Sequence, residues 1–173
     1  MADAAGKSAR WKSFALALGV IALDRATKLL VERYVSLSAD YKIIPGLFDI
    51  VYWENRGVAF GMFNDSESPW RTGALIALSI AAVVWVSAML WRAKRLDGLL
   101  CWAFALVLGG AAGNLFDRVV SGRVTDFLLF YIGDYQWPAF NVADSAMVIG
   151  CGLLIVDQFR GNKRKVHGKA NVS

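Results

Sequence analysis

Four long apolar segments alternate with more polar ones along the chain. They cover residues 14–31, 72–91, 99–116 and 138–156. An α-helix needs about 20 residues to cross roughly 30 Å of hydrocarbon, and each segment is close to that length. The pattern predicts an all-α membrane protein with four transmembrane helices. We expect a single integral-membrane domain over residues 1–173, with long connections over 32–70 and 119–137.

The first apolar segment could also be the hydrophobic part of a cleaved signal peptide, because Lys7, Arg10 and Lys12 precede it. A signal peptide would end in a small-x-small cleavage site. Here LDRATK follows, and more apolar residues come after it. We therefore expect a retained signal-anchor helix.

Both long connections contain patterns typical of strands. Residues 48–53 are rich in β-branched and aromatic side chains and predict a strand, with a turn at 55–57. Residues 58–63 then return as a second strand or as a segment dipping into the membrane, so this loop is either a packed hairpin or a surface lying on the bilayer. In the other connection, Ser121-Gly122 predicts a hairpin turn, and alternation over 124–128 predicts a strand.

The composition supports a membrane location, because 57% of the 173 residues are hydrophobic and 19% are charged. The net charge of +5 comes from basic residues before the first helix, between the second and third, and after the fourth. Alternating helices put these three regions on one side. The positive-inside rule makes that side the cytoplasm, with both termini there. The basic residues therefore set the orientation of the protein in the membrane and contact anionic lipid, and they do not predict nucleic-acid binding.

Polar residues gather at the outer ends of the predicted helices. Asp24 and Lys28 are an i,i+4 pair on one face, while Arg25 lies on another face and is expected to snorkel to the interface. If the last helix begins at Pro138, Asp144 lies six residues, or about 9 Å, into it. Because separate segments converge on one layer, we expect a common polar pocket open to the outer leaflet. Its candidate residues are Asp24, Lys28, Asn114, Asp117, Arg118, Asp126, Asn141 and Asp144.

Carboxylates are the chemical groups best placed to react in this layer. The only histidine, His167, follows the last helix, which removes histidine-based triads and histidine-ligated zinc from this layer. Cys101 and Cys151 lie in apolar segments and are expected to be packing residues, not a disulfide. Two neighbouring carboxylates cannot both ionise easily, so one holds a proton while the other accepts one from water. Asp126 and Asp144 are the pair that we favour for this arrangement, which aspartic proteases use.

Five short motifs, taken in order, resemble those of bacterial lipoprotein signal peptidase, also called signal peptidase II. They are LDRATK (Leu23–Lys28), ENRGVAFG (Glu54–Gly61), GGAAGNLFDR (Gly109–Arg118), VTDF (Val124–Phe127) and FNVAD (Phe140–Asp144). The resemblance implies an aspartyl endopeptidase of the bacterial inner membrane that cleaves diacylglyceryl-modified prolipoproteins just before the lipidated cysteine. It also implies four transmembrane helices with a small periplasmic β-cradle and a short periplasmic helix.

The resemblance assigns the catalytic pair to Asp126 and Asp144. It assigns substrate-binding or supporting positions to Asp24, Lys28, Asn55, Gly110, Asn114, Arg118 and Asn141. Arg25 stands where the family usually has glutamine, and Asp117 is interpreted as structural. The resemblance implies no metal and no organic cofactor. The expected partners are the prolipoprotein substrate, membrane lipid and the inhibitor globomycin, with the enzyme acting as a monomer near the periplasmic face.

Two other classes of protein could use the same residues. A small proton-coupled transporter would use the intramembrane carboxylates as relay groups, and a non-enzymatic membrane scaffold would use them only for structure. The polar groups all lie at one boundary, and the inner halves of the helices are apolar. A transport pathway needs polar groups at several depths, so the residues favour the enzyme.

Overall fold

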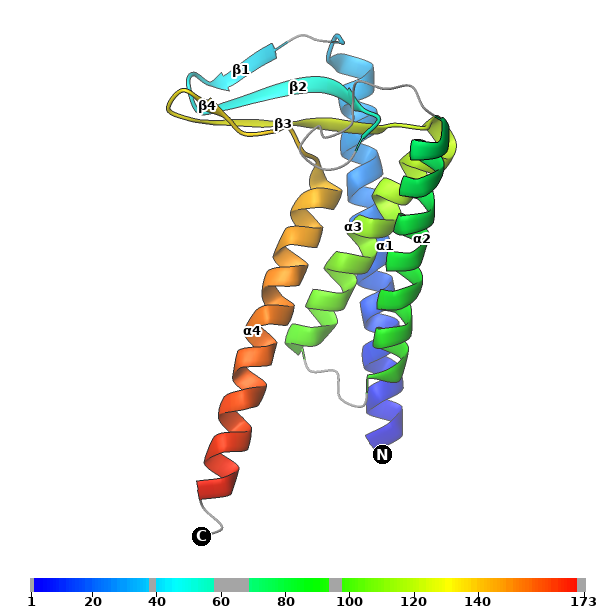
Figure 1. The fold of residues 1–173 in the computed structure, drawn as a ribbon, viewed down its shortest axis with the longest axis vertical. Coiled ribbons are helices and arrows are strands. Elements are labelled where there is room, and N and C mark those ends of the chain that lie inside the picture. The colour runs from blue at the N-terminus through cyan, green and yellow to red at the C-terminus, as the bar shows by residue number, and fades with distance from the viewer. Residues whose placement is uncertain (1, 38–39, 58–68, 94–97, 171–173) are drawn as a thin grey trace.

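The structure is a computed structural model that describes residues 2–37, 40–57, 69–93 and 98–170, without the side chains of 2–7, 69, 71 and 161–170. The elements in order are α1 (Ala2–Tyr34), β1 (Asp40–Ile44), β2 (Phe48–Asn55), α2 (Pro69–Arg92), α3 (Gly98–Ser121), β3 (Val124–Ile132), β4 (Tyr135–Gln136) and α4 (Val142–Ala170). The helices lie below a small sheet, and the two ends of the chain lie at the opposite end of the molecule (Figure 1). The expected mainly helical architecture with a small sheet is confirmed.

Three of the described helices are long and apolar enough to cross a membrane, over Thr72–Arg92, Gly98–Ser121 and Val142–Arg160. The fourth long helix, α1, does not meet the same criterion. Asp24, Arg25 and Lys28 interrupt its apolar run. These residues are mostly turned inward, with Asp24 and Lys28 fully buried.

Helix α3 is the central element and packs against the other three helices. Its glycines allow close approach, as the small-residue pattern predicts. A Cβ atom at Gly109 would lie 2.8 Å from the carbonyl oxygen of Ala17 in α1. A Cβ atom at Gly110 would overlap the carbonyl oxygen of Ala143 in α4. The expectation that Gly110 must be small therefore has a direct steric reason.

The four strands form one antiparallel sheet in the order β1-β2-β3-β4. The predicted strands over 48–53 and around Asp126 are confirmed. Strand β2 pairs with β3, so that Trp53 lies opposite Asp126 and Asn55 lies opposite Val124. The expected return strand at 58–63 lies outside the described residues. No short helix occurs in the described parts of the two connections.

The expected start of the fourth helix and the expected hairpin at Ser121-Gly122 are both wrong. The fourth helix begins at Val142, not Pro138, because Phe140 is still extended and exchanges backbone hydrogen bonds with Leu128 of β3 (N···O 2.8 and 3.0 Å). The predicted hairpin at Ser121-Gly122 is instead the end of α3. Gly122 has a φ of +71° and donates to the carbonyl oxygen of Arg118, as a glycine after a helix does.

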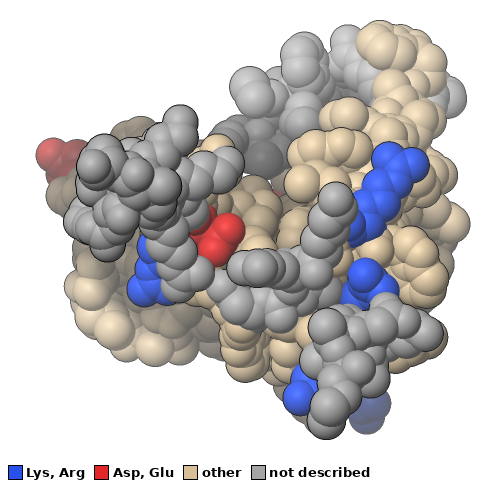
Figure 2. Space-filling model, turned by 90° about the horizontal axis from the view of Figure 1, so that it is seen from below, with Lys and Arg blue, Asp and Glu red and all other residues tan. Residues whose placement is uncertain are grey.

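Basic side chains gather around the end of the molecule that lies away from the sheet (Figure 2). Within the described residues, the start of α1 and the end of α2 contact each other there. Arg10 donates to the carbonyl oxygen of Ala93 and lies 5.9 Å from the ring centroid of Trp91. The basic regions therefore share one end of the fold, as alternation of the helices predicts.

Candidate active site

The backbone brings Asp126 and Asp144 to the same cavity. Asp126 lies on β3, and Asp144 is the third residue of α4. The pairing of Phe140 with Leu128 holds the start of α4 against β3. Both aspartates line a cavity of about 410 Å³. Asp144 is therefore in the first turn of its helix, not about 9 Å into it as the sequence had predicted.

Asn141 caps α4 and fixes Asp144 by a reciprocal pair of hydrogen bonds. The Asp144 backbone N–H donates to Asn141 Oδ1 (3.0 Å), and the Asn141 backbone N–H donates to Asp144 Oδ2 (3.2 Å). This is the geometry of a capping box, with asparagine in place of the usual serine or threonine and aspartate in place of the usual glutamate or glutamine. The capping also places the Asp144 carboxylate at the positive end of the helix dipole.

Each oxygen of the two carboxylates accepts a hydrogen bond. Asp126 accepts from the side-chain amides of Asn141 (2.7 Å) and Asn55 (2.9 Å). Asp144 accepts from the side-chain amide of Asn114 (2.8 Å) in addition to the Asn141 backbone. Three asparagines from separate elements therefore hold the two acids in place.

The surroundings of Asp126 raise its pKa toward neutrality. Burial raises the pKa of Asp126 to about 7, and the negative charge of Asp144 acts in the same direction. The amide donors of Asn55 and Asn141, and the charge of Lys28, oppose this rise in pKa. Asp126 can therefore hold a proton or release it near pH 7.

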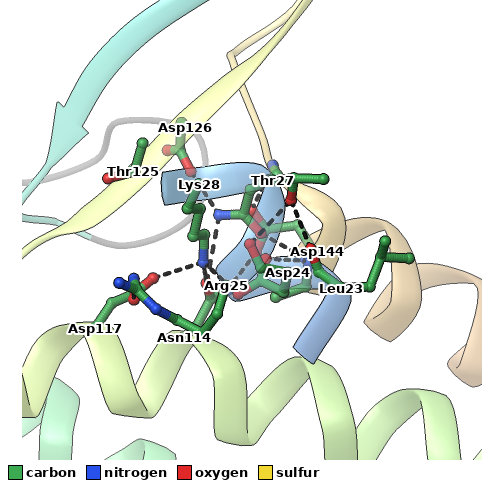
Figure 3. A network of polar contacts seen from close by, with 12 residues as sticks. Leu23, Asp24, Arg25, Thr27, Lys28, Asn114, Asp117, Thr125, Asp126 and Asp144 are labelled. Atoms are coloured by element: carbon green, nitrogen blue, oxygen red, sulfur yellow. Dashed lines mark hydrogen bonds and ion pairs between the residues drawn. The ribbon is translucent and has the colours of Figure 1, made fainter. Parts of the chain in front are cut away.

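A buried ion cluster lies beside the two aspartates. The Lys28 ammonium donates to Asp24 Oδ2 (2.7 Å), Asp117 Oδ2 (2.6 Å) and Asn114 Oδ1 (3.0 Å). Figure 3 shows Lys28 reaching from α1 toward Asn114 and Asp117 on α3. The other oxygen of Asp24 accepts from the backbone N–H of Ala143 (2.9 Å), which ties α1 to the start of α4. The predicted Asp24–Lys28 pair is confirmed.

The expectation that Arg25 snorkels to the interface is wrong. Arg25 donates to Asp117 Oδ1 at 2.6 Å and lies 5.2 Å from the ring centroid of Phe116. Arg25 and Lys28 bind different oxygens of the Asp117 carboxylate, so Arg25 has a charged partner inside the fold. Asp117 thus joins two cations from α1 to α3, which agrees with its interpretation as structural.

Arg118 places a cation on the wall of the cavity. Its guanidinium donates to the backbone carbonyl oxygens of Asn114 (3.3 Å) and Gly57 (3.4 Å). The Gly57 N–H in turn donates to Asn55 Oδ1 (2.8 Å), so the predicted turn at 55–57 is held by its own asparagine. Arg118 therefore links α3 to the turn that carries Asn55.

The rest of the cavity wall is apolar. It includes Met147, Val148 and Ile149 of α4 together with Trp137 and Phe140. Val148 and Ile149 are exposed, so the cavity continues into the outward surface of an apolar helix. An apolar, extended ligand could therefore reach the two acids from the hydrocarbon side.

Among the described residues, no group of three or more His, Cys, Asp or Glu side chains is arranged to hold a metal ion.

Sequence reasoning missed the Asp24–Ala143 contact and the double role of Asn141 in capping α4 and contacting Asp126. The i,i+3 spacing of Asn141 and Asp144 is a signal for a capped helix start, but Pro138 gives a competing signal three residues earlier.

Two solved structures have the same fold as this chain and indicate its class of protein. Both are bacterial membrane enzymes determined by the in meso method. The first has a TM-score of 0.79 and 26% identity, covering 88% of this chain and 90% of its own. The second has a TM-score of 0.74 and 27% identity, covering 84% and 91%. The fold is therefore that of a membrane enzyme.

Sequence relatives identify the family within this class. The signal peptidase (SPase) II family matches residues 16–160. The lipoprotein signal peptidase of Solibacter usitatus (strain Ellin6076) is 55% identical over 164 residues, which are 95% of this chain and 98% of that protein. That of Nitratidesulfovibrio vulgaris (strain DP4) is 43% identical over 145 residues, 84% and 87% of the two chains. The chain belongs to the signal peptidase II family, and the transporter alternative finds no support.

Proposed function

We propose that this chain is an aspartic endopeptidase that removes the signal peptide from diacylglyceryl-modified prolipoproteins. Cleavage takes place just before the lipidated cysteine, and Asp126 and Asp144 are the catalytic pair. The observation that carries this proposal is the cavity in which both carboxylates meet, each oxygen held by a hydrogen-bond donor. The family supplies the substrate class, because its relatives are lipoprotein signal peptidases.

The two acids share one proton and hold a water molecule between them. The ionised acid takes a proton from the water molecule, and the water oxygen attacks the carbonyl carbon of the residue before the lipidated cysteine. The protonated acid donates a hydrogen bond to the developing oxyanion. When the tetrahedral intermediate collapses, the C–N bond breaks and the proton passes to the leaving amine. A pKa of about 7 for Asp126 suits this exchange, since proton transfer is efficient when the pKa lies near the working pH.

The surrounding residues hold this pair and bind substrate. Asn55, Asn114 and Asn141 orient the carboxylates, and Arg118 supplies a cation on the cavity wall that can bind a peptide carbonyl group. The remaining supporting residues act through the fold: Asp24 and Lys28 join α1 to α3 and α4, and Gly110 lets α3 approach α4. No metal or organic cofactor takes part.

All four long helices cross the bacterial inner membrane as one domain. Although α1 carries three charges within its apolar run, Asp24 and Lys28 neutralise each other inside the bundle, and Arg25 pairs with Asp117. The basic end of the fold is cytoplasmic by the positive-inside rule, so both termini lie inside and the sheet and dyad lie near the periplasmic face. The enzyme acts as a monomer, and globomycin inhibits it.

Cleavage of a defined substrate tests this function. The purified chain, in detergent or nanodiscs, is incubated with a diacylglyceryl-modified prolipoprotein and with the same protein lacking the lipid. We expect a product that begins with the lipidated cysteine, identified by mass, only from the modified substrate, and we expect globomycin to block its formation. Cleavage at another bond, or equal cleavage without the lipid, would contradict the proposal.

A further inference from the structure

The fully buried Lys28 ammonium group contacts Asn114, which in turn donates to Asp144. Lys28 Nζ contacts Asp24, Asp117 and Asn114 at 2.7, 2.6 and 3.0 Å. An ammonium group has three N–H donors and accepts no hydrogen bond. All three donors are therefore occupied, and the acceptors that hold them fix the position of Nζ.

The Lys28 ammonium constrains which way the Asn114 side-chain amide faces. Because lysine only donates, the amide atom that faces it must be the carbonyl oxygen, Oδ1. The amide nitrogen then faces Asp144 Oδ1 and donates to it at 2.8 Å. The reversed amide would set its NH₂ group against the ammonium and its oxygen against the carboxylate. Lys28 therefore favours the orientation of the Asn114 amide in which its NH₂ group donates to Asp144.

The same Asn114 oxygen is also connected to Asp126, through Asn141. It accepts a second hydrogen bond from Asn141 Nδ2 at 3.3 Å, and this nitrogen donates to Asp126 Oδ1 at 2.7 Å. The orientation of Asn114 is thus consistent with amide donation to both aspartates. The Lys28 ammonium group is therefore connected to Asp144 through Asn114, and to Asp126 through Asn114 and Asn141.

Asn114 differs from the other two asparagines in what orients it. Backbone N–H groups orient Asn55 and Asn141, at Gly57 and Asp144, and a backbone N–H is always a donor. The Asn114 oxygen instead faces two side-chain donors, the ionisable Lys28 ammonium group and, at a longer distance, the Asn141 amide nitrogen. We propose that Lys28 is a positioning residue, whose ammonium group fixes the Asn114 amide so that its NH₂ donates to Asp144. This proposal rests on the function proposed for Asp126 and Asp144.

A double-mutant cycle tests whether Lys28 acts through Asn114. Lys28→Met removes the donors with little change in volume, and Asn114→Ala removes the amide. We expect each to lower kcat by roughly 10- to 100-fold with little change in KM, because the misplaced group is a catalytic acid and not a binding contact. The double variant should be no slower than Asn114→Ala alone, since an effect transmitted through Asn114 cannot be lost twice.

A pH profile adds a readout that a merely structural lysine would not change. The charged groups that act on the pair are Lys28 from α1 and Arg118 from α3, together with the two acids themselves, and Lys28 is in turn paired with Asp24 and Asp117. Without the Lys28 cation, the ionised form of Asp126 is less stable. The basic limb of kcat/KM in Lys28→Met should therefore move to higher pH.

Removing Lys28 alone leaves the Asp24 carboxylate buried without its cation, which can prevent folding. The companion variant Asp24→Asn/Lys28→Met removes both charges together, while Asp117 keeps its ion pair with Arg25. We expect this variant to fold and to show the same loss of kcat. Arg25→Gln is the matched control, because it changes the same cluster without touching Asn114. Its kcat should stay within about twofold of the parent enzyme, since the Lys28–Asn114 and Asn114–Asp144 contacts remain in place.

Three results would overturn the positioning role. The first is additive losses of kcat in the cycle. The second is a folded Asp24→Asn/Lys28→Met variant with the kcat and pH profile of the parent. The third is failure of both Lys28 variants to fold, which would make Lys28 a structural residue. None of these results concerns Asp126→Asn or Asp144→Asn, so failure of the dyad itself would be recognised separately.

Discussion

At the level of single residues, Asp126 combines burial with two amide donors. Burial favours its protonated form, whereas the Asn55 and Asn141 amides stabilise its ionised form. The balance puts its pKa at about 7, so the acid is neither permanently charged nor permanently neutral at the pH of the cell. Burial without the amide donors would leave the pKa of Asp126 higher, and the donors without burial would leave it lower.

The raised pKa of Asp126 predicts how activity depends on pH. Asp126 holds a proton below about pH 7 and loses it above, which leaves the pair without the acid that stabilises the oxyanion. We expect kcat/KM to fall above pH 7, approaching a tenfold loss per pH unit. Asn55→Ala removes a donor to the ionised form, so its basic limb should move to higher pH. Initial cleavage rates between pH 5 and 9 measure both effects, and a rate that stays constant to pH 9 would contradict them.

At the level of elements, the start of α4 does most to assemble the site. Backbone pairing with β3 ends at Phe140, Asn141 caps the helix, and Ala143 contacts both Asp24 and Gly110. The close approach of α3 at Gly110 holds this turn in place. The position of Asp144 therefore depends on packing between two helices as well as on its own hydrogen bonds.

Adding one methyl group at Gly110 should separate these helices. A Cβ atom there overlaps the Ala143 carbonyl oxygen, so we expect Gly110→Ala to destabilise the fold by about 1–3 kcal/mol and to reduce cleavage. Gly152→Ala is the matched control on α4, because a Cβ atom there meets nothing within 4 Å. Thermal unfolding in detergent compares the two variants. Equal stability of Gly110→Ala and Gly152→Ala would show that the contact is not limiting.

At the level of the whole molecule, the fold separates a basic end from the end that carries the two aspartates. The sheet and the start of α4, which carry Asp126 and Asp144, lie at one end of the helices, and the termini lie at the other (Figure 1). Lys12 belongs to the basic end, and the exposed turn between β3 and β4, at the other end, contains Asp134. These two positions should therefore face opposite sides of the membrane.

Labelling of single cysteines in intact cells tests this topology. In a background with Cys101→Ser and Cys151→Ser, a membrane-impermeant maleimide should label Asp134→Cys from outside. Lys12→Cys should be labelled only after the inner membrane is permeabilised, because the basic end is expected in the cytoplasm. The reverse pattern, or external labelling of both, would contradict the proposed orientation.

Side-chain patterns in the sequence predicted much of this arrangement. Apolar segments of membrane-spanning length located the helices. The i,i+4 spacing of Asp24 and Lys28 predicted their contact, because helix geometry determines which residues share a face. The pairing of Phe140 with Leu128 could not be predicted, since it is made by backbone atoms that every residue has. The contact of Arg25 with Asp117 was missed because it depends on how α1 and α3 are rotated against each other.

Cleavage by variants of the two aspartates tests the central claim most directly. Asp126→Asn and Asp144→Asn are each compared with Asp134→Asn, which neutralises an exposed acid away from the cavity, after thermal unfolding has shown that all three are folded. The diacylglyceryl-modified prolipoprotein is the substrate, and the amount of mature lipoprotein is the readout. We expect both site variants to lose cleavage by at least about a thousandfold, because a pair that acts as a unit fails when either member is removed, and we expect Asp134→Asn to retain the parent rate. Substantial cleavage by a folded Asp126→Asn or Asp144→Asn enzyme would contradict the account.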